Sequence, residues 1–120
     1  TIKKLNDRVR YNTYDEIKLR HQKDFKDEMC NALEFIKNDF FGLEIDLDAI
    51  PNIASSAMTL SGFSVEELRQ FIYYFSQNQN ASYLHICEGA PVLGEEKNNH
   101  LTGKLIGYLV TDFIKGNSQA

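Results

Sequence analysis

Two stretches that favour β-strands stand on either side of one amphipathic helix, and this order constrains the fold more than any other feature of the chain. In residues 41–48 apolar and polar side chains alternate, so that Leu43, Ile45 and Leu47 share one face. Residues 81–87 are also rich in strand-forming residues. A strand, a helix and a second strand in this order predict a right-handed crossover that joins two parallel strands.

The helix between the two strands has a clear beginning. Ser64 precedes Glu67 by three residues, the spacing of a capping box in which each side chain accepts a hydrogen bond from the other residue's backbone amide. Apolar residues then recur at helical spacing: Leu68, Phe71, Ile72 and Phe75. We expect these aromatic side chains to pack in a core and not to stack on nucleic-acid bases.

Two further amphipathic helices flank this central unit. The first begins at Asp24, ends near Asn38, and carries its apolar residues at Phe25, Met29, Leu33 and Ile36. The second follows a polar loop at 94–99 and carries Leu101, Leu105, Tyr108, Leu109 and Phe113. Gly103 and Gly107 are expected to let this helix lie close to the sheet. The predicted fold class is α/β, with parallel strands and flanking helices.

The ends and the size of the chain suggest part of a larger protein. Residues 1–21 mix basic and polar side chains with no clear period, so we expect a linker or arm before a folded region at 22–120. Two parallel strands make a poor sheet by themselves, because parallel sheets are normally broad and covered on both faces. The missing initial methionine fits a fragment as well.

Composition and charge argue against several functions. The formal net charge is −4, which disfavours nucleic acid as a partner. No run approaches the roughly 18 apolar residues of a membrane span, so no membrane partner is expected. The two cysteines, Cys30 and Cys87, are expected to be reduced thiols in a soluble, cytoplasmic protein.

Acidic residues gather where the first predicted strand ends. The alternation of residues 41–48 places Glu44, Asp46 and Asp48 on one face, and Glu88 follows the second strand. Functional groups of parallel α/β sheets lie outside the carboxyl ends of the strands. Carboxylate oxygens suit divalent ions such as magnesium or manganese. A metal site at Asp46 and Asp48 is therefore predicted, with ordinary solvated carboxylates as the alternative.

Several segments taken together resemble the C-terminal part of the ureohydrolases, which include arginase, agmatinase and formimidoylglutamase. They are the strand at 42–48, the loop at 55–64, the following helix, and the strand that leads to Glu88-Gly89-Ala90-Pro91. The resemblance covers about residues 40–115. It implies a fragment of a larger three-layer arginase-like sheet, and a parent enzyme in which a hydroxide between two manganese ions attacks a guanidino or formimino carbon.

The resemblance implies roles for four residues. Asp46 and Asp48 would be metal ligands, while Thr59 and Glu88 would lie at the substrate, with Glu88 beside its cationic nitrogen. The family's Thr-Pro is Thr59-Leu60 here, and its Asn-Pro after the glutamate is replaced by Gly89-Ala90-Pro91. An ordinary loop role for Thr59 and a turn role for Glu88 are the alternatives.

The family's other metal ligands lie in its N-terminal half, and the three histidines of this chain lack their spacing. We therefore expect this chain alone to bind Mn²⁺ weakly and to be inactive. The parent enzyme would hydrolyse a C–N bond, as a formimidoylglutamase or an arginase-like enzyme.

Two other functions compete with this interpretation. Phosphatases of the haloacid dehalogenase type also have Asp-x-Asp at a strand end, but a small-threonine turn usually follows, where this chain has Ala49-Ile50-Pro51. A non-catalytic partner-binding α/β domain is the main alternative. Both it and the ureohydrolase-like fragment predict a homo-oligomer, so metal binding, and not dimerisation, separates the two.

Overall fold

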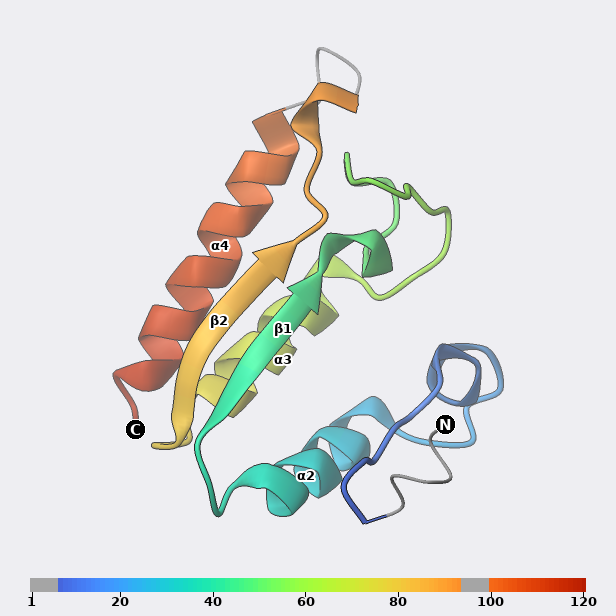
Figure 1. The fold of residues 1–120 in the computed structure, drawn as a ribbon. Helices are drawn as coiled ribbons and strands as arrows, with labels where there is room; N and C mark the ends of the chain where they lie inside the picture. The colour runs from blue at the N-terminus through green and yellow to red at the C-terminus, as the bar shows by residue number, and fades with distance from the viewer. Residues whose placement is uncertain (1–6, 94–99) are drawn as a thin grey trace. The chain divides into compact units, whose positions relative to one another are not determined.

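A computed structural model describes residues 7–93 and 100–120 of the chain (Figure 1). The chain divides into two compact units: the first ends at Ile36, and the second is Lys37–Ala120. Among the helices of these described ranges, none has the length and apolar character needed to cross a membrane.

The first unit contains two helical segments. A single π-helical turn, η1, spans Asp15–Leu19 and buries Ile17. Its start is fixed by Thr13, whose backbone amide donates to the Glu16 carboxylate at 3.0 Å. The helix α2 spans Phe25–Ile36 and buries Met29, which confirms the helix expected from the apolar spacing. The sequence did not predict η1, because one turn is too short to show a period; whether residues 1–21 act as an arm stays a prediction.

The second unit is built on two parallel strands. Strand β1 spans Phe41–Asp46, strand β2 spans Ala81–Cys87, and they pair in parallel as the only strands in the described ranges. The crossover between them contains α3, Val65–Ser76, and β2 is followed by α4, His100–Asn117. The predicted parallel pair and its flanking helices are therefore confirmed.

The expected capping box is present at the start of α3. The Glu67 backbone amide donates to the Ser64 hydroxyl at 3.1 Å, and the Ser64 amide donates to the Glu67 carboxylate at 2.9 Å. The core of the second unit lies between the sheet and these two helices (Figure 1). It buries apolar side chains from β1, from the turn that follows β1 and from both helices: Leu43, Ile45, Leu47, Ile50, Ile72, Phe75, Leu105 and Leu109.

Two residues predicted for the apolar face of α4 lie outside the core. Leu101 and Tyr108 are both exposed. The Tyr108 ring instead packs against the guanidinium of Arg69 in α3, whose carbon is 5.0 Å from the ring centroid. Arg69 in turn forms a two-pronged ion pair with the buried carboxylate of Asp112, with nitrogen–oxygen distances of 2.7 and 3.1 Å. A charged pair thus occupies a place on the α3–α4 contact where the helical period predicts apolar packing.

The close approach of α4 is not at the glycines expected from the sequence. A Cβ atom added to Gly103 or Gly107 would meet nothing within 4 Å, so that prediction is wrong. A Cβ added to Gly116 would lie 1.7 Å from the Ser76 hydroxyl oxygen and 3.0 Å from the Tyr73 carbonyl oxygen. The helix α4 therefore approaches α3 closely near its C-terminal end, and it is Gly116 that permits the contact.

Candidate functional site

The carboxyl ends of the two strands are joined by a short backbone pairing. Ser55, in the loop after β1, forms an antiparallel bridge with Gly89, just after β2. The Ser56 amide donates to the Glu88 carbonyl, and the Ala90 amide donates to the Ala54 carbonyl, both at 2.9 Å. These bonds hold the loop that follows β1 against the end of β2.

The strand β1 ends earlier than the alternation predicts. Residues Leu47–Ala49 form a 3₁₀ turn, η2, which Asp46 caps by accepting a hydrogen bond from the Asp48 amide at 2.8 Å. The prediction that Asp48 continues the strand face of Glu44 and Asp46 is therefore wrong. An aspartate that accepts the amide two residues later favours a turn over an extended chain. The turn directs Asp48 toward the loop that contains Ser56.

Asp48 is firmly held as an anion. Its carboxylate accepts a hydrogen bond from the Ala57 amide at 2.9 Å and another from the Ser56 hydroxyl at 3.1 Å. The hydrogen bond from the Ala57 amide contributes most to lowering the pKa of Asp48 below its ordinary value, and the hydroxyls of Ser55 and Ser56 lower it further. The carboxylate is therefore ionised at neutral pH, as a metal ligand must be.

The Ser56 hydroxyl also contacts the carboxylate of Glu88. Asp48 and Glu88, which lie forty residues apart in the sequence, thus face the same hydroxyl group. Glu88 itself has a φ of 67°, in the left-handed region that residues other than glycine seldom adopt. Such backbone strain persists where neighbouring bonds enforce it, and it is common at functional sites. Here the enforcing bond comes from the Ser56 amide.

The four residues that the sequence singled out are only partly brought together. Asp46, Asp48 and Glu88 form one chain of hydrogen bonds, through the Asp48 amide and the Ser56 hydroxyl. Thr59 is not part of it: its hydroxyl donates to the Ser61 carbonyl at 2.9 Å, within its own loop.

Sequence reasoning missed the two serines of the loop. Ser55 is 1% exposed, and its hydroxyl oxygen, although close to Asp48, has no well-formed hydrogen bond in the described residues. Ser56 makes the contacts that join Asp48 to Glu88. Serines are common in polar loops, so nothing in the sequence distinguishes these two from Ser61.

The donor set fits one side of a metal centre. Asp46 and Asp48 offer carboxylate oxygens, which suit manganese or magnesium. Nowhere in residues 7–93 and 100–120 do three or more histidine, cysteine, aspartate or glutamate side chains gather to hold a metal ion. A complete coordination sphere would therefore need ligands from outside these residues.

Glu44 belongs to a separate cluster on the exposed face of the sheet. Its carboxylate accepts a hydrogen bond from the Tyr83 hydroxyl at 2.7 Å, and its other oxygen lies 2.5 Å from His85 Nδ1. The hydrogen bond from Tyr83 contributes most to lowering the pKa of Glu44, and the bond to His85 lowers it further. The expected row of three carboxylates is thus divided, since Glu44 is engaged with its neighbours on β2. His85 is exposed in this cluster.

Replacing Tyr83 by phenylalanine should raise the pKa of Glu44 toward its ordinary value, because the hydrogen bond that lowers this pKa most is lost. Any stabilisation from this lowered pKa is present above the ordinary glutamate pKa and is lost as pH falls through the lowered value. NMR titration of the Glu44 carboxyl carbon measures the change, with Asp48 as an internal reference. An unchanged Glu44 pKa would mean that the Tyr83 bond does not form in solution.

Cys87 has the properties of a packed residue. Its thiol donates to the Ile45 carbonyl at 3.6 Å. Burial raises the pKa of the thiol. The surrounding carboxylates, Asp46 most strongly, raise it further. A raised pKa disfavours the thiolate and hence a nucleophilic role.

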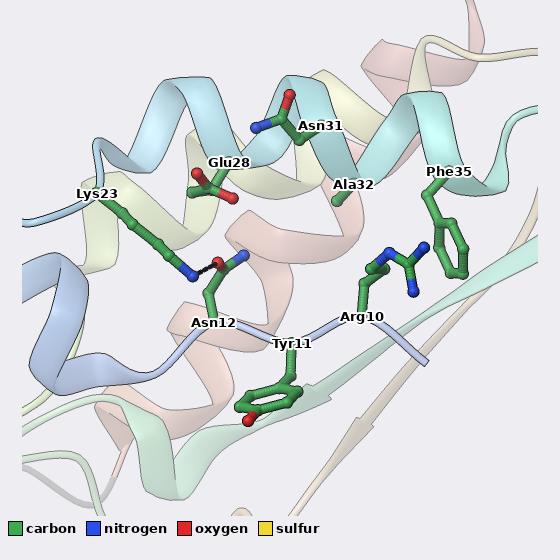
Figure 2. Close-up of a pocket in the computed structure, with 8 residues that line it drawn as sticks. All are labelled: Arg10, Tyr11, Asn12, Lys23, Glu28, Asn31, Ala32 and Phe35. Atoms are coloured by element: carbon green, nitrogen blue, oxygen red, sulfur yellow. Dashed lines mark hydrogen bonds between the residues drawn. The ribbon is translucent and has the colours of Figure 1, made fainter. Parts of the chain in front are cut away.

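A groove of about 330 Å³ lies in the first unit (Figure 2). The Arg10 guanidinium carbon is 4.9 Å from the centroid of the Phe35 ring, and Lys23 Nζ donates to the Asn12 side chain at 2.9 Å. Lys23 also pairs with Glu16 at 3.2 Å. The positive groups of this groove are thus engaged by the chain itself, and it contains none of the carboxylates at the strand ends.

Comparison with known proteins adds a finding about the fold. No family model and no curated protein matches the sequence. Among solved structures, the formimidoylglutamase of Bacillus subtilis is similar over 98% of this chain and 36% of its own, with a TM-score of 0.81 and 22% identity. An arginase of Bacillus subtilis is similar over 78% of this chain and 32% of its own, with a TM-score of 0.66 and 22% identity.

An arginase of Bacillus caldovelox is similar over 90% of this chain and 38% of its own, with a TM-score of 0.67 and 18% identity. The chain therefore spans about a third of the length of the structures it resembles. At these identities the similarity concerns the fold. The parallel strands and flanking helices described above accordingly form part of the ureohydrolase fold, as found in arginase and formimidoylglutamase.

Proposed function

We propose that this chain supplies part of a metal-dependent hydrolase site that cleaves the C–N bond of a guanidino or formimino group. The observation that supports it most is the shared Ser56 hydroxyl, which places the ionised Asp48 beside Glu88 at the ends of two parallel strands. The fold shared with an arginase and a formimidoylglutamase supports the same class of reaction.

In this proposal the carboxylates have different roles. Asp46 and Asp48 bind the metal, with Mn²⁺ as the preferred ion, and a divalent ion of this kind supplies hydroxide near neutral pH. Glu88 binds the cationic nitrogen of the substrate and orients it. Thr59, in the loop that carries Ser56, lies beside the substrate in this proposal.

The properties of the whole protein are proposed on the same basis. The parent enzyme acts on a small guanidino or formimino substrate, forms a homo-oligomer in the cytoplasm, and needs neither nucleic acid nor a membrane. This chain by itself is inactive, because two carboxylates leave most of the metal's coordination positions to ligands from elsewhere.

Titration with Mn²⁺ tests the metal site. At a concentration about tenfold above the dissociation constant, binding should stabilise the native chain by roughly 1.4 kcal/mol. This corresponds to a rise of about 4–8 °C in the melting temperature for a chain of this size. The double variant Asp46→Asn, Asp48→Asn should lose the shift, whereas the control Glu44→Gln should keep it, since Glu44 lies on the same strand but in the separate cluster with Tyr83.

A second candidate is the non-catalytic partner-binding domain. It is favoured by the two-stranded sheet itself, because within the described ranges each strand has one edge without a hydrogen-bonded neighbour. Such edges can pair with a strand of another subunit. This function predicts a tight dimer and no stabilisation at millimolar Mn²⁺, so a melting temperature that stays constant in the titration would favour it.

A further inference from the structure

We propose that Ser56 is a positioning residue that fixes the Glu88 carboxylate beside Asp48. The inference rests on the proposed function, in which Asp48 binds the metal and Glu88 binds the substrate's cationic nitrogen. It adds a residue to which the resemblance to ureohydrolases gives no role.

Ser56 holds Glu88 at two points. Its backbone amide donates to the Glu88 carbonyl at 2.9 Å, and its hydroxyl contacts the Glu88 carboxylate. The same hydroxyl lies 3.1 Å from the Asp48 carboxylate. A hydroxyl carries a single proton, so it can donate to only one of the two carboxylates at a time. The hydroxyl therefore lies between two like charges and donates to one of them at a time.

The two carboxylates depend on Ser56 to different degrees. Asp48 also accepts the Ala57 amide at 2.9 Å, so it stays oriented without the hydroxyl. The Glu88 carboxylate has no further hydrogen bond among the described residues. Loss of the Ser56 hydroxyl should thus release the Glu88 side chain, which the negative charge of Asp48 then drives away, while Asp48 keeps its place.

The loop that carries Ser56 is fixed by other contacts. Ser55 is buried and paired with Gly89 through the backbone, and the Thr102 hydroxyl donates to the Ala54 carbonyl at 3.1 Å. The Ser56 side chain, by contrast, is exposed. Its removal is therefore expected to leave the loop and the fold in place.

Paramagnetic relaxation by Mn²⁺ measures the expected displacement. In the chain labelled with ¹³C at its carboxyl groups, bound Mn²⁺ should enhance relaxation of the carboxyl carbons of Asp46, Asp48 and Glu88. In Ser56→Ala the enhancement at Glu88 should fall several-fold, because it decreases steeply with distance, while that at Asp48 stays the same. Ser56→Thr, which restores a hydroxyl, should recover the enhancement at Glu88. The control Ser118→Ala, whose hydroxyl bonds only within the last turn of the chain, should match the wild type.

The outcomes separate this inference from the function it rests on. Equal enhancement at Glu88 in the wild type and Ser56→Ala would overturn the role of Ser56 and leave the metal site standing. Absence of enhancement at Asp46 and Asp48 in the wild type would overturn the proposed function and this inference together. If Ser56→Ala does not fold, Ser56→Cys keeps the shape with a weaker donor, and the same loss at Glu88 is expected.

Discussion

Replacing Phe75 by alanine is expected to lower the free energy of unfolding by about 4 kcal/mol. Phe75 is 2% exposed, and its ring extends from the helix α3 to the start of the strand β1. Its ring meets that of Phe71 at a centroid distance of 4.6 Å and that of Phe41, at the start of β1, edge-on at 6.4 Å. The substitution removes buried apolar surface and also the contacts of three neighbouring rings, those of Phe41, Phe71 and Tyr74.

Chemical denaturation followed by circular dichroism measures this loss. Small domains are commonly stable by only about 5–15 kcal/mol, so the variant should unfold at a much lower denaturant concentration. Tyr73→Ala is the matched control, because Tyr73 is an exposed aromatic residue on the same helix, and its loss should cost far less. Equal losses in the two variants would contradict the packing of α3 on the sheet described above.

The elements of the second unit could be predicted because their residues follow simple local rules. The apolar alternation of β1 and the spacing of Ile72 and Phe75 in α3 each repeat often enough to show a period, and the capping box at Ser64 marks where α3 begins. These rules depend on neighbours in the sequence, so they can be applied without knowledge of the tertiary fold.

The features that were predicted wrongly depend on distant residues. Gly103 and Gly116 look alike in a helical sequence, and only the packing of α4 against Ser76 shows which of them permits a close approach. Tyr108 fits the apolar period of α4, but it lies outside the core because Arg69 and the buried Asp112 form an ion pair nearby. Periodicity describes one helix face and contains no information about its partner.

The candidate site, too, could be predicted only in part from the sequence. Asp46 and Asp48 follow an apolar strand, and Glu88 follows the next one, so the sequence could place all three at one end of the sheet. It could not show that a turn at Asp46 separates Asp48 from the strand, nor that Ser56 joins Asp48 to Glu88. The contacts of Ser56 arise from the pairing of two segments that lie more than thirty residues apart, whereas the turn is a local bond that the apolar alternation does not reveal.

Replacing Gly116 by alanine should destabilise the chain by about 2 kcal/mol, because the added methyl group overlaps α3. The overlap involves the Ser76 hydroxyl oxygen at 1.7 Å, the Ser76 Cβ at 2.8 Å and the Tyr73 carbonyl oxygen at 3.0 Å, so rotation of the serine side chain alone cannot remove it. Alanine favours a helix over glycine by about 1 kcal/mol, which offsets part of the cost.

Gly107→Ala is the matched control, since a methyl group there meets open space and should stabilise α4 by up to about 1 kcal/mol. The opposite signs of the two changes, measured by thermal and chemical unfolding, distinguish packing from helix propensity. Adding Ser76→Gly to Gly116→Ala removes both serine atoms from the overlap and should recover part of the lost stability. If Gly116→Ala stabilised the chain as Gly107→Ala does, the close contact between α3 and α4 at Ser76 would not form in solution.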